Sequence, residues 1–202
     1  MVNAPVFAET YRRYLDRLQA VDLIERAERL GAKVDGDGLL IPLYDRLYRV
    51  SGRAISTVSG TEVSPAVRVI LACYVLSCPD HPVPDPGRLV SYREFPDAAP
   101  LLSYFASNAT GAIEAAFSGR ADRLGQAGEK CGGRVEKHAS YDVALRFLAL
   151  PQIPVVLYFN DRDDLFPAAC SLLYHLSAGR FLDMECLAMT GTLLAALLVA
   201  GR

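Results

Sequence analysis

The chain has 202 residues, a length that fits one domain with a substantial core. Hydrophobic residues make up 51% of it and charged residues 22%, which excludes the polar composition of a disordered chain. Lys and Arg total 21 against 23 Asp and Glu, so no overall positive charge attracts nucleic acid or an anionic membrane. We expect neither as a partner.

The cysteine content and the apolar segments predict a soluble cytoplasmic protein. Five cysteines without a C-x-x-C pair argue against a disulfide framework and favour a reducing compartment. Residues 1–12 lack the apolar run of a secretory signal. The long apolar stretch at 187–200 is shorter than the roughly 20 residues that span a bilayer, which predicts a buried helix.

The first third of the chain changes from helix to strand at Gly31. Apolar residues recur every three or four positions between residues 10 and 30, which predicts one N-terminal helix within residues 1–30. Asp22 with Arg26 and Glu25 with Arg29 have the acid-first spacing of stabilising helix pairs. Short strands separated by turns are predicted after Gly31, over 32–35, 39–43 and 47–51.

The middle of the chain predicts two more helices. Ser64 and Pro65 are suited to the N-cap and the first position of a helix that ends before Pro79. Four prolines then predict a stiff surface loop over 79–87. Helical spacing returns over 101–117, where Asn108 is suited to cap a fresh helix start, and the glycines that follow predict a flexible segment over 119–133.

The last third predicts a β-meander followed by a helix. Side chains alternate over 141–147, and residues 153–159 and 168–176 are similarly extended. Their short connections favour antiparallel neighbours, and Asp183 or Glu185 is suited to open a final helix. The predicted fold class is α+β: one domain, 1–202, with an antiparallel sheet of the meander and the N-terminal hairpin strands, packed with about four to six helices.

Two polar segments are candidates for a ligand site. Asp161, Asp163 and Asp164 form the densest acidic cluster, and their oxygens suit a hard cation, although the spacing is not that of an EF-hand. The alternative is a polar turn in which aspartates accept backbone hydrogen bonds. The segment 88–95 carries arginines that suit a carboxylate or phosphate, or that only form structural ion pairs. We hypothesise that both segments meet in one ligand-binding site, made of Arg88, Tyr92, Arg93, Glu94, Asp161, Asp163, Asp164 and Phe166.

The remaining reactive side chains indicate no specific chemistry. The three histidines form no spaced ligand pair, so no metal site is expected. Cys73 and Cys170 lie in apolar segments and are interpreted as core residues, whereas Cys131 is expected to be exposed, with His138 as a hypothetical base. The sequence contains no G-x-S-x-G, P-loop or G-x-G-x-x-G motif, so the cofactor and the substrate are unknown.

Several runs of the chain carry a family resemblance, namely residues 150–159, 163–168 and 181–185, with further similarity at 92–96 and from Leu39 onward. These runs resemble an uncharacterised prokaryotic family, catalogued as domain of unknown function 3786. The resemblance implies an anaerobic context near corrinoid or iron–sulfur one-carbon metabolism, and a helper or binding module for a metallocofactor system. This chain lacks the four closely spaced cysteines of an iron–sulfur cluster, so we expect it to hold none.

Three functional hypotheses remain open from the sequence. The first is an accessory or ligand-binding module for an unknown small molecule or protein, linked through the resemblance to anaerobic corrinoid or one-carbon metabolism. The second is a small enzyme that uses Asp161, Asp163 or Asp164 as general base or metal ligand. The third is a structural protein that forms a homodimer through its first or its last helix.

Overall fold

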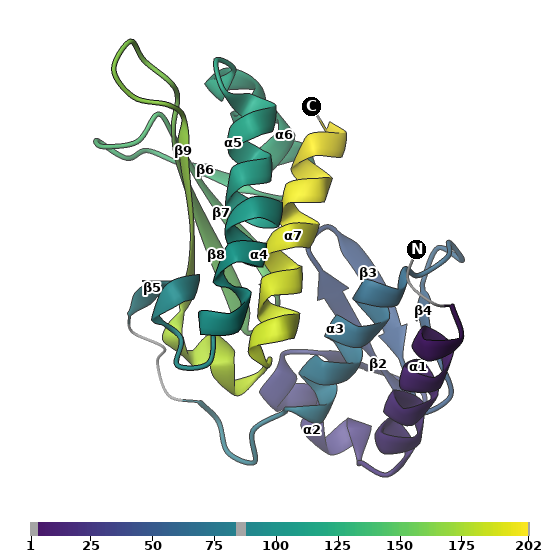
Figure 1. Ribbon diagram of the computed structural model, residues 1–202. Helices are drawn as coiled ribbons and strands as arrows, with labels where there is room; N and C mark the ends of the chain where they lie inside the picture. Colours follow the sequence, from purple (N-terminus) through teal and green to yellow (C-terminus); the bar gives the residue numbers. More distant parts are fainter. Residues whose placement is uncertain (1–3, 84–87, 202) are drawn as a thin grey trace.

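The first part of the chain forms helices and a four-stranded antiparallel sheet in the computed structural model, which describes residues 4–83 and 88–201 (Figure 1). The strands follow one another in the order β1-β2-β3-β4. Ser64 accepts a hydrogen bond from the backbone of Val67 and starts α3, as predicted from the Ser64-Pro65 pair. The elements are α1 (Ala4–Gln19), α2 (Leu23–Leu30), β1 (Lys33–Asp35), β2 (Gly38–Leu43), β3 (Arg46–Val50), β4 (Ile55–Thr57) and α3 (Pro65–Leu76).

Two helices, α1 and α2, take the place of the single helix predicted within residues 1–30. Helix α1 ends at Gln19, and Asp22 lies in an extended conformation and accepts a hydrogen bond from the backbone of Glu25, so it caps α2. Arg26 does not pair with Asp22. Its guanidinium donates to the carbonyls of Val75 and Leu76, at 2.8 and 3.2 Å, and so ties α2 to the C-terminal end of α3.

The second sheet confirms the predicted meander. Its five strands are all antiparallel, in the order β5-β9-β8-β7-β6. The N-terminal strands form a separate sheet instead of joining it, and one backbone hydrogen bond of 2.9 Å, from Tyr44 to Ala149, links the two. The strands are β5 (Leu89–Ser91), β6 (Arg134–Glu136), β7 (Val143–Leu150), β8 (Ile153–Asn160) and β9 (Ala169–His175).

Helices cover one face of the five-stranded sheet (Figure 1). Asn108 does not cap a new helix, because a π-helical turn over Ala106–Thr110 joins α4 to α5 without a break. If α4, the π-helical turn and α5 are counted as one continuous helix, the described residues contain six α-helices. Together with the antiparallel sheets, these helices confirm the α+β class. The elements are the short turns η1 (Tyr92–Glu94), η2 (Ala99–Leu101) and η4 (Leu176–Arg180), and the helices α4 (Leu102–Phe105), α5 (Gly111–Phe117), α6 (Ala121–Lys130) and α7 (Met184–Gly201).

The segment expected to be flexible, 119–133, contains α6 and packs on the sheet. A Cβ atom on Gly128 would lie 2.6 Å from a methyl group of Leu145, and one on Gly133 would lie 2.5 Å from the ring of Phe147. These two glycines therefore allow close approach to β7 rather than freedom of the chain. The predicted loop over 79–87 is described only up to residue 83, because 84–87 lie outside the described residues.

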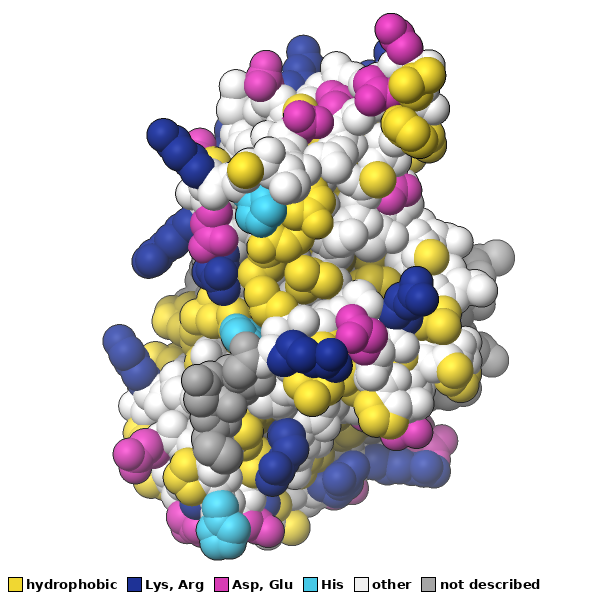
Figure 2. All heavy atoms as spheres, turned by 90° about the vertical axis from the view of Figure 1, so that its left-hand side faces the viewer, with side chains coloured by type: hydrophobic (Ala, Val, Ile, Leu, Met, Phe, Trp, Pro, Cys, Tyr) yellow, Lys and Arg dark blue, Asp and Glu magenta, His cyan; other side chains and the backbone are white. Residues whose placement is uncertain are grey.

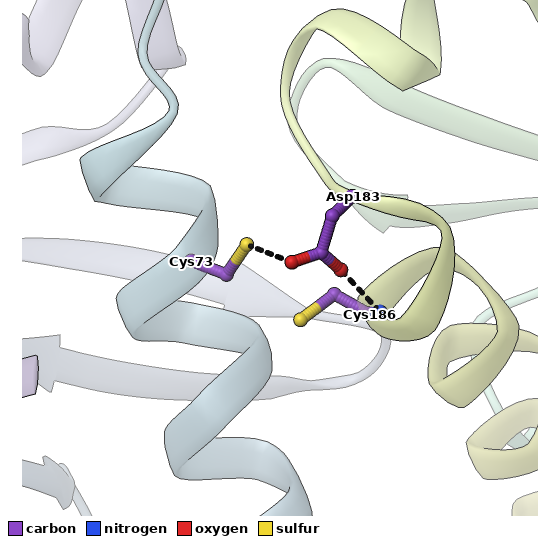
Figure 3. A group of neighbouring side chains, drawn as sticks. All are labelled: Cys73, Asp183 and Cys186. Atoms are coloured by element: carbon purple, nitrogen blue, oxygen red, sulfur yellow. Dashed lines mark hydrogen bonds between the residues drawn. The ribbon is translucent and has the colours of Figure 1, made fainter. Parts of the chain in front are cut away.

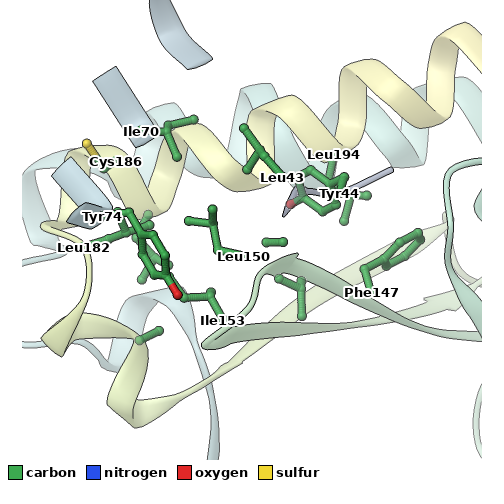
Figure 4. Packing of buried hydrophobic residues seen from close by; sticks show 14 of the residues in the cluster. Leu43, Tyr44, Ile70, Tyr74, Phe147, Leu150, Ile153, Leu182, Cys186 and Leu194 are labelled. Atoms are coloured by element: carbon green, nitrogen blue, oxygen red, sulfur yellow. The ribbon is translucent and has the colours of Figure 1, made fainter. Parts of the chain in front are cut away.

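Helix α7 contacts helices from both the first and the second part of the chain. It is long and apolar enough to cross a membrane by length and composition alone, but it packs against α3, α5 and α6 inside the protein. Figure 4 shows Cys186 and Leu194 of this helix beside Leu43, Ile70 and Leu150. This packing is that of a core helix of an α+β protein. Its buried residues are Cys186, Leu187, Ala188, Thr190, Gly191, Leu194, Ala195 and Leu198.

The opposite face of the five-stranded sheet is open among the described residues. Hydrophobic side chains gather in the middle of this face (Figure 2). Leu148, which is 49% exposed, belongs to the lining of a hollow on the surface. This hollow of about 220 Å³ lies at one end, lined by Pro154, His175 and Phe181 among others. None of the eight residues predicted to bind a ligand lines this hollow.

Candidate functional site

The structure places the two predicted ligand-binding segments at opposite ends of the five-stranded sheet (Figure 1). The acidic turn joins β8 to β9 beyond the pair Asn160 and Ala169. Strand β5 pairs with the other end of β9, with Leu89 opposite His175 and Ser91 opposite Leu173. About four residues of β9, or about 13 Å, separate the paired ends. The structure therefore does not bring these two segments together.

The aspartates of the acidic turn already accept hydrogen bonds from the backbone. Asp161 accepts from Gly119 and Ala121, so it caps the start of α6 from across the fold. Burial alone would raise the pKa of Asp161, but these donors and the amide of Arg162 outweigh burial and lower it. Asp163 accepts hydrogen bonds from the backbone amides of Leu165 and Phe166, both at 2.7 Å. The polar-turn alternative thus describes these two carboxylates.

The tip of this turn is apolar and exposed. Leu165 is 82% exposed and Phe166 is 67% exposed, and Asp164 beside them is also exposed. Phe166 therefore does not line a pocket with the aspartates. These side chains belong to the surface of the hairpin tip.

The segment after β5 is held together by its own contacts. Glu94 accepts hydrogen bonds from the amide and hydroxyl of Ser91 at 2.9 and 3.0 Å, and it pairs with Arg88 at 3.4 Å. These contacts, the Ser91 hydrogen bonds first, lower the pKa of Glu94. Arg93 is exposed. The Arg88–Glu94 pair lies on the surface, which is typical of a structural ion pair of small effect.

Tyr92 is a core residue and not a ligand contact. Its side chain is 2% exposed and its ring stacks on Phe105 with centroids 4.3 Å apart. Its hydroxyl donates to the carbonyl of Met184 at 2.7 Å, at the start of α7. Burial raises its pKa to about 12, so the phenol stays protonated at neutral pH. Tyr92 therefore fixes the beginning of α7.

A cluster of two thiols and a carboxylate lies where α3 meets the first turn of α7 (Figure 3). The Sγ of Cys73, the Sγ of Cys186 and a carboxylate oxygen of Asp183 all lie within 4.8 Å of one another. Cys73 and Cys186 are buried, 6% and 1% exposed, whereas Asp183 is exposed. We call these three residues the thiol cluster.

Local structure positions each member of the thiol cluster. Asp183 precedes α7 and accepts a hydrogen bond from the amide of Cys186 at 2.7 Å, which is the contact of an N-cap residue. Its other oxygen accepts from the thiol of Cys73 at 3.5 Å. The same thiol lies 3.8 Å from the hydroxyl of Ser77, one turn along α3. The N-cap contact therefore orients the other carboxylate oxygen of Asp183 toward the Cys73 sulfur across the interface between α7 and α3.

The two thiols differ in how readily they lose a proton. A side-chain hydrogen bond with Cys186 lowers the pKa of Cys73 below its usual value. The same hydrogen bond and then burial raise the pKa of Cys186. The phenol of Tyr14 on α1 also lies near: burial raises its pKa first, and the charges of Cys186, Cys73 and Asp183 raise it further. A cation in the cluster would stabilise both thiolates.

The other cysteines lie elsewhere. Cys131 was expected to be exposed, but it is only 7% exposed, because it follows α6 and packs in the core. Burial raises its pKa, which argues against a reactive thiolate there. Cys170 lies on β9, and burial raises its pKa as well. His138 packs with Tyr141 and Tyr158 on the surface and not with Cys131.

These observations describe an α+β protein with a buried pair of thiols beside a capping carboxylate. A family model described as "Domain of unknown function (DUF3786)" matches residues 22–197. The chain belongs to this family, as the sequence resemblance predicted. The comparisons with curated proteins and with solved structures found no match.

Sequence reasoning missed the thiol cluster. Cys73 was interpreted as a small core residue, and it is buried, but its sulfur also faces Asp183 across 110 residues of sequence. Asp183 was predicted to open the last helix, and Cys186 follows it by one helical turn. This D-x-x-C pattern at a helix start was the available signal, but nothing in the sequence pairs it with Cys73.

Proposed function

We propose that this protein is an accessory protein that binds one thiophilic transition-metal ion at the thiol cluster. The observation that carries the proposal is the convergence of two sulfur atoms and one carboxylate oxygen within 4.8 Å, from two helices far apart in sequence. Thiolates favour Zn²⁺ and Cu⁺ over Mg²⁺ and Ca²⁺, which prefer oxygen ligands.

The ligand set defines the chemistry of the proposed site. Cys73 and Cys186 would bind as thiolates, so each bound ion displaces two thiol protons. Asp183 would bind through the oxygen that now accepts the Cys73 hydrogen bond, while its other oxygen keeps capping α7. Three protein ligands leave one position of a tetrahedral ion open. An open position suits an ion that is exchanged with a partner or that reacts.

The proposal includes the finer parts of the sequence-based hypothesis. A cytoplasmic location fits it, because a reducing compartment keeps both thiols available. A helper role in an anaerobic corrinoid or one-carbon system, as the family resemblance implies, would make the partner a metalloprotein. The enzyme hypothesis at the acidic turn lacks support, since Asp161 and Asp163 already accept backbone hydrogen bonds. A homodimer stays a prediction, to be tested by light scattering.

Titration of the reduced, metal-free protein with Co²⁺ tests the proposal, because Co²⁺ replaces Zn²⁺ at thiolate sites and absorbs light there. We expect one ion per chain, a sulfur-to-cobalt charge-transfer band, and displacement by Zn²⁺. The Cys73→Ala and Cys186→Ala variants should lose the band, while the matched control Cys131→Ala keeps it. Circular dichroism confirms that each variant is folded. An unchanged band in the Cys73→Ala Cys186→Ala double variant, or no band in the parent protein, overturns the proposal.

A further inference from the structure

The thiol cluster also has the geometry of a redox pair. Cys73 and Cys186 are both free thiols, and their sulfur atoms lie within 4.8 Å of each other. A disulfide needs the sulfurs to approach to about 2.05 Å. In Figure 3 both side chains project into the same space between α3 and α7, so rotation about the side-chain bonds brings the sulfurs closer.

We propose that a hydroperoxide oxidises Cys73 and Cys186 to a disulfide that joins α3 to α7. The inference uses the same two residues as the proposed metal site, but it stands on the sulfur geometry alone and requires no metal. It assigns a further chemical activity to this protein: reversible two-electron oxidation of a buried dithiol.

Burial selects the class of oxidant. Cys73 is 6% exposed and Cys186 is 1% exposed, so a bulky disulfide such as oxidised glutathione cannot reach either sulfur in line. Hydrogen peroxide is small enough to enter. Cys73 is the more accessible of the two and is the sulfur that reacts first, while Cys186 lies in the first turn of α7 and is the less exposed.

The reaction balances with one molecule of hydrogen peroxide. The Cys73 sulfur attacks one peroxide oxygen, the O–O bond breaks, and the products are Cys73 sulfenic acid and water. The Cys186 sulfur then attacks the Cys73 sulfur, the S–O bond breaks, and a second water leaves with the Cys186 proton. In sum, two thiols lose two electrons and two protons, and hydrogen peroxide is reduced to two waters.

The disulfide has a consequence for the proposed metal site. It uses both sulfur donors, so the oxidised protein would retain only Asp183 of the three ligands. Peroxide would therefore release the ion, and a bound ion would slow the oxidation because both sulfurs are occupied. Only this consequence rests on the proposed function.

Treatment of the reduced, metal-free protein with hydrogen peroxide tests the inference by intact mass and by non-reducing peptide mapping. We expect a monomer about 2 Da lighter, a cross-linked peptide pair with Cys73 and Cys186, and full reversal by dithiothreitol. The cross-link closes a long loop and should raise Tm. The Cys170→Ala control should form the same cross-link. The Cys73→Ala variant should instead leave Cys186 reduced.

The opposite results are equally specific. Oxidation that stops at sulfinic acid, or cross-links between molecules or to another cysteine, overturns the inference. Because the oxidation is done without metal, it can succeed while Co²⁺ binding fails, and the reverse. A comparison of oxidation rates with and without bound Zn²⁺ then tests the link between the two: at least tenfold protection is expected, and equal rates exclude it.

Discussion

The acidic turn and the thiol cluster each hold three side chains with ligand-type atoms, but they use those atoms differently. In the turn, the carboxylates of Asp161 and Asp163 already accept hydrogen bonds from the backbone amides of Gly119, Ala121, Leu165 and Phe166, so a ligand would have to compete with these contacts. In the thiol cluster, the Cys73 sulfur contacts one carboxylate oxygen and the Ser77 hydroxyl, and the Cys186 sulfur lies within 4.8 Å of both ligand atoms. Polar density in the sequence is thus a poorer guide to a binding site than the hydrogen bonds already made.

The largest expected effect separates the two regions by metal affinity. The Cys73→Ala Cys186→Ala double variant should lose at least about 100-fold in Zn²⁺ affinity, because both thiolate ligands are gone. Asp161→Asn with Asp163→Asn should leave the affinity within about twofold, since these carboxylates serve the backbone. Competition with a chromophoric chelator measures both. An equal loss in the aspartate variant would move the site to the turn.

The next largest effect concerns stability at the turn. Asp161→Ala should lower the free energy of unfolding by about 2 kcal/mol, because the amides of Gly119 and Ala121 lose a charged acceptor. The exposed Asp164 is the matched control, and Asp164→Ala should change stability by less than about 0.5 kcal/mol. Urea denaturation at pH 7 measures both. Equal values for the two variants would show that the capping contact contributes nothing.

Asp183 allows its two roles to be separated. Asn also caps helices well, so Asp183→Asn should keep the free energy of unfolding within about 0.5 kcal/mol. Loss of the carboxylate should weaken Zn²⁺ binding about tenfold. Asp183→Ala removes the cap as well and should cost about 1 kcal/mol. Unchanged Zn²⁺ affinity in Asp183→Asn would remove this residue from the ligand set.

The turn should also show a specific acid dependence. The folded state lowers the pKa of Asp161 below the usual value of 3.8, so this group stabilises the fold above pH 3.8. That contribution is lost as the pH falls through the lowered pKa. The stability difference between the parent protein and Asp161→Asn should therefore be constant above about pH 5 and shrink in this acidic range. Denaturation between pH 2 and 7 measures it, and a constant difference would contradict the assignment.

The smallest effect is expected at the hairpin tip. Leu165→Ser and Phe166→Ser should each change the free energy of unfolding by less than about 0.5 kcal/mol, because both side chains are mostly exposed. The same measurement on Phe159→Ser, a fully buried residue of β8, provides the contrast with a loss above about 3 kcal/mol. A large loss in the free energy of unfolding for either tip variant would mean that the hairpin tip is buried in solution.

The sequence by itself determined the elements whose signals are local. The alternation over 141–147 predicted β7, and the Ser64-Pro65 pair predicted the start of α3, because side-chain period and capping depend on adjacent residues. Asp22 is also a local signal, but its spacing from Arg26 predicts a helix pair, whereas the residue caps α2. The glycines at 128 and 133 looked like flexibility, since their closeness to β7 is not local.

Only the tertiary structure decided which polar residues are free. Asp161 accepts from Gly119 and Ala121, about 40 positions away, and this contact turns an apparent ligand into a helix cap. Cys73 meets Asp183 and Cys186 only because α7 packs against α3 in the core. Hydrogen bonds and ligand sets depend on distances of a few ångströms in space, and the order of residues along the chain does not specify those distances.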